Sequence, residues 1–189
     1  MLFHETPLAG AYSIDLQKRS DDRGFFARAF CKNEFTQFEL TTNFVQVNNS
    51  LSVDQGTLRG MHYQLAPRAE TKLVRCVRGA LWDCILDLRP ESANFGHWYG
   101  ELLSAENRRM MYVPKGFAHG FMTLEPNTEA FYFVDEFYAP EQERGVRWDD
   151  PNFSIRWPME PKFLSDKDRN QRNFDPAWHL NAPESEVPA

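Results

Sequence analysis

Residues 56–64 read GTLRGMHYQ, and this stretch decides the fold that we expect. It carries three side chains that can bind anions or move protons: Arg59, His62 and Tyr63. In an extended strand, the even-numbered residues from Gly60 to Gln64 point to one face and the odd-numbered ones to the other. Gly60 would also let another segment approach the backbone closely. The stretch therefore predicts a strand that lines a pocket.

Short apolar or alternating segments occur along the rest of the chain, separated by polar turns. They cover residues 45–51, 71–77, 80–88, 97–104, 110–113, 117–124 and 130–138. A spacing of about 8–12 residues is typical of an all-β sandwich or barrel. Arg78-Gly79 joins two of these runs and predicts a β-hairpin between residues 71–77 and 80–88.

The ends of the chain are less regular than its middle. Residues 11–16 predict an edge strand, residues 25–30 an aromatic strand, and residues 32–40 a helix with an apolar side. A short helix is expected to begin near Ser165, which has the character of an N-cap residue. We expect one domain over residues 1–179 and a flexible tail over residues 180–189.

Composition limits the class of protein. The chain has 189 residues, which suits one domain, and a formal net charge of -6, which argues against nucleic-acid or anionic-membrane partners. Three scattered cysteines favour reduced thiols over a disulfide framework. The N-terminus lacks a signal-peptide pattern, and no run approaches the roughly 18 apolar residues of a membrane span. A cytoplasmic location is expected.

Polar groups from three segments are candidates for chemistry. Arg59 and His62 lie on the central strand, and Lys72 opens the next strand after a loop. Tyr132 and Tyr138 are six residues apart, so an unbroken strand would place both on one face. Taken singly, each of these groups more often has a structural role, as a hydrogen-bonded histidine, a surface lysine or a core aromatic.

The spacing Pro114-x-Gly116-x-x-His119 resembles the second motif of metal-binding cupins. Their first motif needs two histidines as HxH, whereas the corresponding place reads His62-Tyr63-Gln64. A metal site of His62, His119 and Glu70 remains an alternative. A jelly-roll fold is favoured more strongly than the metal.

A longer set of motifs resembles the dTDP-4-dehydrorhamnose 3,5-epimerase family. The motifs are DRGFF at 22–26, QVNNS at 46–50, GTLRGMHYQ at 56–64, KLVRCVRG at 72–79, LSAEN at 103–107, VPKGFAHGF at 113–121, FYAPEQERGVRWDDP at 137–151 and LSDKD at 164–168. The resemblance implies a jelly-roll (cupin) sandwich with a few short, mainly C-terminal helices. It also implies an isomerase that needs no metal and no cofactor, and a homodimer in which the N-terminal strands contact the partner.

The resemblance implies roles for four residues. His62 would be the base that removes a proton, since imidazole titrates near the working pH. Asp168 would orient His62 and balance its charge. Tyr132 would return a proton from the opposite face of the sugar. Lys72 would stabilise the enolate oxygen.

The same resemblance implies a set of substrate-binding residues. Arg23 and Arg59 would bind the diphosphate, a task that suits the forked guanidinium. The other matching positions are Phe26, Gln46, Asn48, His119, Tyr138, Glu143 and Lys167. Phe26 and Tyr138 would lie near the nucleotide base, with Gln46 and Asn48 supplying amides for its edge.

Two residues depart from the family pattern. Arg28 stands where the family commonly has a glutamate at the nucleotide site, and Asn49 stands where a histidine is frequent. A carboxylate suits the N3–H donor of thymine, whereas Arg28 suits an acceptor such as cytosine N3, or simply adds charge near phosphate. CDP is therefore an alternative to dTDP. Asn49 leaves open whether one or both sugar carbons are inverted.

The expected function is epimerisation at C3 and/or C5 of a nucleotide-linked 4-keto-6-deoxyhexose, within a pathway to a deoxysugar of bacterial surface polysaccharide. The nearest alternatives are an epimerase for one carbon only and an enzyme for a CDP-linked sugar. More remote alternatives are a metal-dependent cupin, such as an oxygenase, and a sugar-nucleotide binding module without catalysis.

Overall fold

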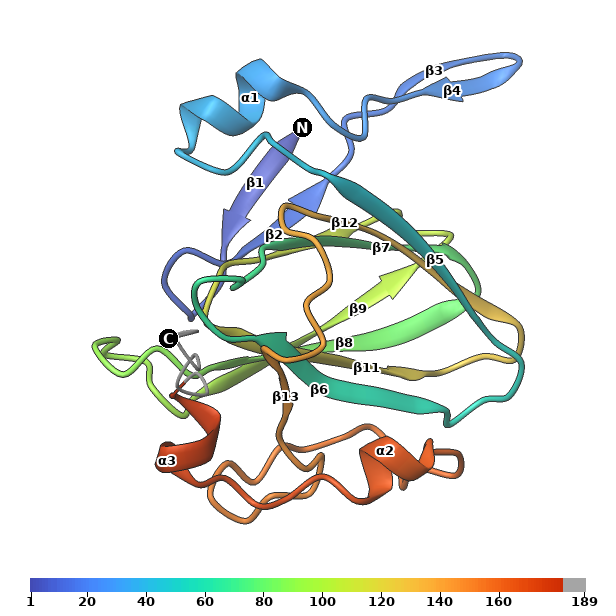
Figure 1. Cartoon of the computed structure of the whole chain (residues 1–189). Coiled ribbons are helices and arrows are strands. Elements are labelled where there is room, and N and C mark those ends of the chain that lie inside the picture. The colour runs from blue at the N-terminus through green and yellow to red at the C-terminus, as the bar shows by residue number, and fades with distance from the viewer. Residues whose placement is uncertain (182–189) are drawn as a thin grey trace.

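Two antiparallel β-sheets form the body of the protein, described by a computed structural model over residues 1–181 (Figure 1). In order across the first sheet lie β1 (Leu2–Glu5), β2 (Tyr12–Asp15), β10 (Met110–Val113), β7 (Lys72–Arg78), β12 (Thr128–Val134) and β5 (Gln46–Ser52). In order across the second lie β13 (Glu143–Gly145), β6 (Leu58–Gln64), β11 (Phe117–Thr123), β8 (Ala80–Asp87) and β9 (Trp98–Ser104). This architecture confirms the all-β jelly-roll prediction.

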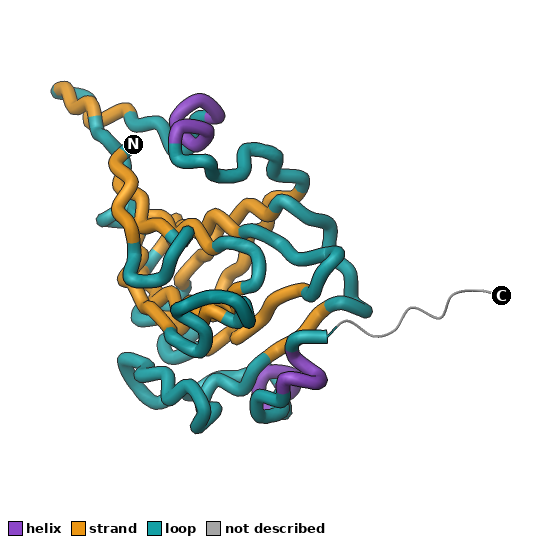
Figure 2. Tube along the Cα trace, turned by 90° about the vertical axis from the view of Figure 1, so that its left-hand side faces the viewer, coloured by secondary structure: helices purple, strands orange, loops and turns teal. Residues whose placement is uncertain are grey.

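The remaining elements lie outside the two sheets. They are the hairpin of β3 (Arg19–Asp21) and β4 (Gly24–Phe26), and the helices α1 (Lys32–Gln37), α2 (Asp166–Arg169) and α3 (Pro176–His179). Helix α1 lies on one side of the sandwich and α2 and α3 on the other, while the hairpin projects from the body (Figure 1, Figure 2). Within residues 1–181, no helix is long and apolar enough to cross a membrane.

Alternation along the strands divides the apolar residues among three clusters. On β8, Leu81 and Ile85 enter the core between the sheets, whereas Cys84 and Leu86 lie in a second cluster under the C-terminal segment. On β7, Val74 faces the central core. Its neighbour Leu73 packs in a third cluster with residues of the N-terminal segment. The outer faces of the two sheets are thus buried where the N-terminal and C-terminal segments cover them, which explains why strands such as β8 read as nearly continuous apolar runs.

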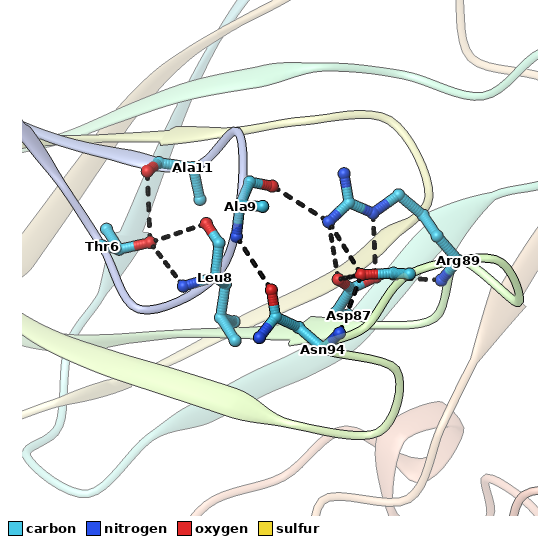
Figure 3. Close-up of polar contacts among 8 residues, drawn as sticks. Thr6, Leu8, Ala9, Ala11, Asp87, Arg89 and Asn94 are labelled. Carbon is cyan, nitrogen blue, oxygen red and sulfur yellow. Dashed lines mark hydrogen bonds and ion pairs between the residues drawn. The ribbon is translucent and has the colours of Figure 1, made fainter.

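A polar network ties the two sheets together (Figure 3). Arg89, which follows β8, donates to the buried carboxylate of Asp87 at 2.6 Å and to the carbonyl of Ala9 at 2.9 Å. Ala9 lies between β1 and β2, and its N–H donates to Asn94 at 3.2 Å. Burial raises the pKa of Asp87, but hydrogen bonds from Arg89 and Ser92 outweigh this and hold it below its usual value. The carboxylate therefore anchors a cross-link from the first sheet to the second.

Glycine at position 60 is required by close packing of two central strands. A Cβ there would lie 2.4 Å from the Cα of Gly120 on β11, and Gly60 has a φ of 137°. Side chains rarely adopt that backbone conformation. The close approach predicted for Gly60 is therefore made by β11, the strand that also carries His119.

Gly60→Ala is expected to destabilise the fold by at least ~2 kcal/mol, because overpacking and an unfavourable φ act together. Urea denaturation followed by circular dichroism measures the loss. Gly24→Ala is the matched control, since Gly24 has a φ of 131° but a Cβ there would meet nothing within 4 Å. Equal losses in the two variants would contradict the steric explanation.

The predicted hairpin between residues 71–77 and 80–88 was wrong. β7 lies in the first sheet and β8 in the second, so the chain turns a corner between sheets at Gly79. A Cβ on Gly79 would lie 2.4 Å from the Thr128 hydroxyl, which leaves room for glycine alone. Two apolar runs joined by a short turn fit a hairpin and a corner equally well, because both strands are buried on two faces.

Three predictions at the ends of the chain also need correction. Residues 11–16 do not form an edge, because β1 pairs on the outer side of β2. Strand structure over residues 25–30 stops at Phe26, since Phe30 turns inward to pack on Phe35. Leu180 packs on the C-terminal cluster and so does not belong to a free tail. Residues 182–189 of the predicted flexible tail lie outside the described residues.

Candidate active site

A cleft lies between the sheets, and strands of both sheets line it. It has two lobes, with volumes of about 280 Å³ and about 240 Å³. His62, Lys72 and Tyr132 line both lobes. The imidazole comes from β6 of the second sheet, whereas the ammonium and the phenol come from β7 and β12 of the first. A molecule in the cleft would therefore meet His62 on one wall and Tyr132 and Lys72 on the other.

His62 is hydrogen-bonded to a buried carboxylate. Its Nε2 lies 2.5 Å from Oδ1 of Asp168, whose side chain is 4% exposed. Asp168 lies on α2, which begins after Ser165 as the sequence predicts. The Ser165 hydroxyl donates to Oδ2 of Asp168 at 2.8 Å and accepts from its backbone N–H at 3.0 Å.

The charge of Asp168 is maintained despite its burial. Burial alone raises the pKa of this carboxyl, but the hydrogen bond and charge of His62, with help from Ser165 and Lys167, hold it below its usual value. A carboxylate in contact with an imidazole fixes the ring and stabilises its protonated form. The pair is therefore suited to accept a proton from a molecule in the cleft.

Tyr132 and Lys72 present hydrogen-bond donors on the facing wall. Burial raises the pKa of Tyr132, the charge of Glu70 adds to this rise, and Arg59 opposes it, so the phenol keeps its proton at neutral pH. The Lys72 ammonium lies 3.0 Å from Oε1 of Glu70 and 3.4 Å from the carbonyl of His62. Together they offer a hydrogen-bond donor and a positive charge to an anion in the cleft.

Eight further predicted residues line one lobe or the other. Gln46, Asn48, Tyr138 and Glu143 line the first lobe. Arg59, His119, Lys167 and Asp168 line the second. Within these lobes, Glu143 accepts from Tyr138 at 2.9 Å and from Lys167 at 2.6 Å. Arg59 is oriented by bonds to Ser52 and to the carbonyl of Leu51.

The expectation that Tyr132 and Tyr138 share one strand was wrong, although both reach the cleft. β12 ends at Val134, and Tyr138 lies in the loop that follows. The Tyr138 N–H donates to the side chain of Gln46 at 3.1 Å, which attaches this loop to β5. The sequence pattern missed the break because aromatic residues continue past the end of the strand.

Each residue of the alternative metal set has another partner. His62 bonds to Asp168, Glu70 pairs with Lys72, and His119 lies 2.8 Å from the buried carboxylate of Asp83. Across residues 1–181, no group of three histidine, cysteine or acidic side chains is arranged to hold a metal ion. His119 is instead a cleft residue with its own carboxylate partner.

Three predicted residues lie away from the cleft of their own chain. Arg23 and Phe26 are on the projecting hairpin, with the Arg23 side chain 90% exposed and Phe26 63% exposed. Arg28 and Phe26 line a separate cavity of about 220 Å³ near the N-terminus. The absence of these three residues from the cleft lining is the largest difference between the predicted and the observed site.

Ser50 and Ser165 are among the cleft residues that sequence reasoning missed. Ser50 lies on β5 in step with Gln46 and Asn48, so the alternation of that strand could have identified it. Ser165 was recognised as an N-cap residue, but its bond to the Asp168 carboxylate was not expected. Nothing in the sequence indicates that the capping hydroxyl of Ser165 also donates a hydrogen bond to a side chain.

Comparison with known proteins gives consistent matches over most of the chain. The family model described as dTDP-4-dehydrorhamnose 3,5-epimerase matches residues 5–175. The dTDP-4-dehydrorhamnose 3,5-epimerase of Shigella flexneri is 46% identical over 155 residues, which are 82% of this chain and 85% of that protein.

Solved structures agree with the sequence matches. The dTDP-4-dehydrorhamnose 3,5-epimerase of Bacillus anthracis, with TDP and PPi bound, has a TM-score of 0.88 and 43% identity, covering 92% of this chain and 99% of that one. The dTDP-6-deoxy-D-glucose-3,5-epimerase of Legionella pneumophila, in complex with dTDP-4-keto-L-rhamnose, has a TM-score of 0.85 and 36% identity, covering 91% and 92%.

Proposed function

Because the chain belongs to the dTDP-4-dehydrorhamnose 3,5-epimerase family, and is thus an isomerase, we propose that it inverts C3 and C5 of a nucleotide-linked 4-keto-6-deoxyhexose. The observation that carries this proposal is the placement of His62 and Tyr132 on opposite walls of one cleft. Inversion needs a base on one face of the sugar ring and an acid on the other.

The chemistry follows from the position of the ketone. A carbonyl at C4 acidifies the hydrogens on C3 and C5, so the His62 imidazole can take a proton from either carbon. The electron pair of the broken C–H bond moves to the C4 oxygen, and the resulting enolate is stabilised by the Lys72 ammonium. Tyr132 then donates its phenol proton to the opposite face of the carbon, and the carbonyl re-forms. Solvent returns a proton to the phenolate and removes one from the imidazolium.

Binding groups extend on both sides of these residues. Arg59 and Lys167 give the second lobe a positive character that suits a diphosphate. His119, held by Asp83, can donate to a sugar oxygen, and the amides of Gln46 and Asn48 can bond polar edges in the first lobe. The cleft thus suits a ligand with a charged linker and polar groups at both ends.

Proton NMR in deuterium oxide tests this function directly. The enzyme is mixed with dTDP-4-keto-6-deoxyglucose, and the C3 and C5 hydrogen signals are followed separately. Loss of both signals, with appearance of the inverted sugar, supports the proposal. Loss of one signal alone identifies an enzyme that inverts a single carbon, and retention of both refutes the epimerase chemistry.

The nucleotide is expected to be dTDP, with CDP as the alternative that Arg28 raises. Arg28 lies beside Glu34, in a cavity lined also by Arg19 and Phe26, so its charge is partly balanced within the chain. Calorimetric titration with dTDP and with CDP should give the lower Kd for dTDP. Tighter binding of CDP would reassign the nucleotide, and Arg28→Glu should then reverse the order.

A homodimer is proposed as the working form. Val47, Leu51 and Val77 are exposed apolar side chains on the outer face of the first sheet, where a second copy could cover them. Arg23 and Phe26 extend on the hairpin instead of reaching their own cleft. We infer that the hairpin of one protomer serves the cleft of its partner.

Mixed dimers test this arrangement. His62→Asn inactivates the cleft, and the double variant Arg23→Ala/Phe26→Ala inactivates the hairpin. If the hairpin acts on the partner, co-expression of the two inactive chains should restore roughly a quarter of wild-type activity, because half of the dimers then hold one complete site. Absence of any restoration, with heterodimers confirmed by mass spectrometry, would show that each hairpin serves its own chain.

A cytoplasmic location is also proposed. Cys31, Cys76 and Cys84 are all free thiols, and burial raises the pKa of Cys76 to about 11. Free thiols are typical of proteins kept in a reducing compartment.

A further inference from the structure

Glu70 is an acidic residue of the cleft to which the reaction described above gives no role. It lies in the loop before β7, and its side chain lines the first lobe beside His62, Lys72 and Tyr132. Only 14% of the side chain is exposed. A carboxylate held in so enclosed a place needs a partner and affects its neighbours strongly.

Glu70 contacts the wall of the cleft that carries Lys72 and Tyr132. Its Oε1 lies 3.0 Å from the Lys72 ammonium, which is also hydrogen-bonded to the carbonyl of His62 at 3.4 Å. The adjacent Thr71 is fixed on both sides, because its N–H donates to Asp135 at 2.6 Å and its carbonyl accepts from the Asp135 N–H at 3.3 Å. The loop therefore holds the carboxylate in place, and the carboxylate orients the ammonium.

Glu70 also acts on Tyr132 through charge. Burial contributes most to the raised pKa of Tyr132, Glu70 adds to it, and Arg59 opposes it. The other titratable groups in the first lobe are His62, Tyr63, Lys72, Tyr138 and Glu143. Those in the second lobe are His119, Lys167 and Asp168. Among all of these, Glu143 and Asp168 already have close partners in Lys167 and His62.

We propose that Glu70 is a positioning residue that holds the Lys72 ammonium at 3.0 Å and, as a negative charge in the same lobe as Tyr132, keeps the phenol available as the acid, and so sets the upper pH limit of the epimerase. The same carboxylate thus holds the Lys72 ammonium in place by charge attraction and disfavours a second negative charge, the Tyr132 phenolate, in the same lobe. This inference rests on the proposed roles of Lys72 and Tyr132. It does not require Glu70 to touch the sugar.

The test compares Glu70→Gln, which removes the charge and keeps the shape, with Glu70→Asp, which keeps the charge. In Glu70→Gln the alkaline limb of the kcat profile should move to lower pH by roughly half to one unit, with the acid limb unchanged. Glu70→Asp should retain the wild-type limb. Glu91→Gln, a charge change at an exposed loop residue, serves as the control.

A direct measurement accompanies the kinetics. Tyrosine labelled with ¹³C at Cζ is titrated by NMR, and the Tyr132 signal is identified by its loss in Tyr132→Phe. The pKa of Tyr132 should exceed about 10 in the wild type and fall in Glu70→Gln. A wild-type value at or below that of free tyrosine overturns the inference, and this outcome does not depend on the folding of any Glu70 variant.

The outcomes separate this inference from the proposed function. Activity that falls equally at every pH in Glu70→Gln, or that does not change, contradicts the role of Glu70 while leaving the epimerase chemistry intact. Full activity of Tyr132→Phe contradicts the proposed acid itself. The NMR titration reports the electrostatic effect of Glu70 in either case.

Discussion

His62→Asn is expected to lower kcat for epimerisation by roughly 10²–10⁴, the range that a positioned base contributes. The amide cannot accept a proton from carbon, although it can still donate a hydrogen bond toward Asp168. Exchange of the C3 and C5 hydrogens with deuterium oxide should be lost with the turnover, because every exchange begins with proton removal. Both quantities come from one NMR time course.

The matched control is His97→Asn, which makes the same replacement at a histidine that lines a cavity apart from the cleft. It should retain wild-type turnover. Thermal unfolding of both variants checks that the loss in His62→Asn is chemical. Continued exchange at the wild-type rate in His62→Asn would require another base and would remove His62 from its proposed role.

Tyr132→Phe is expected to separate exchange from inversion. His62 still removes the proton and can return a deuteron to the same face, so the sugar signals should fade in deuterium oxide. The opposite face has lost its acid, so formation of the inverted sugar should fall by roughly 10²–10⁴. Among the proposed site residues, only replacement of Tyr132 is expected to allow hydrogen exchange while blocking inversion of the sugar carbons.

Tyr99→Phe provides the comparison for the loss of a phenol outside the cleft. Tyr99 lies on β9 and donates to Glu101, so its variant should change neither exchange nor inversion. Equal rates of inversion in wild type and Tyr132→Phe would show that the proton arrives from elsewhere, with a water or another side chain as the donor.

The all-β class and most strand positions could be predicted, because alternation and turn residues are local features of the sequence. Residues 110–113, for example, form β10 as expected. The assignment of strands to sheets could not be predicted in the same way. β7 and β8 have the same apolar character, and they lie in different sheets because β7 pairs with β10 and β12, whereas β8 pairs with β11 and β9.

In the site, too, local patterns could be predicted from the sequence, whereas contacts between distant residues could not. His62 and Asp168 are 106 positions apart, and no local pattern pairs them; the family resemblance alone indicated their contact. The resemblance also named Arg23 and Phe26, but a single chain does not bring them to the cleft. The sequence pattern indicates Glu70 only as a possible metal ligand, since a sequence does not show which cation a carboxylate faces.

The separate origins of His62 and Tyr132 have a mechanical consequence. Because the two rings belong to different sheets, the gap between them depends on the thickness of the apolar core, which includes Val74 and Ile85, and on the Arg89–Ala9 cross-link. The spacing of the proposed base and acid is thus set by the interior of the sandwich, through residues that do not contact the sugar.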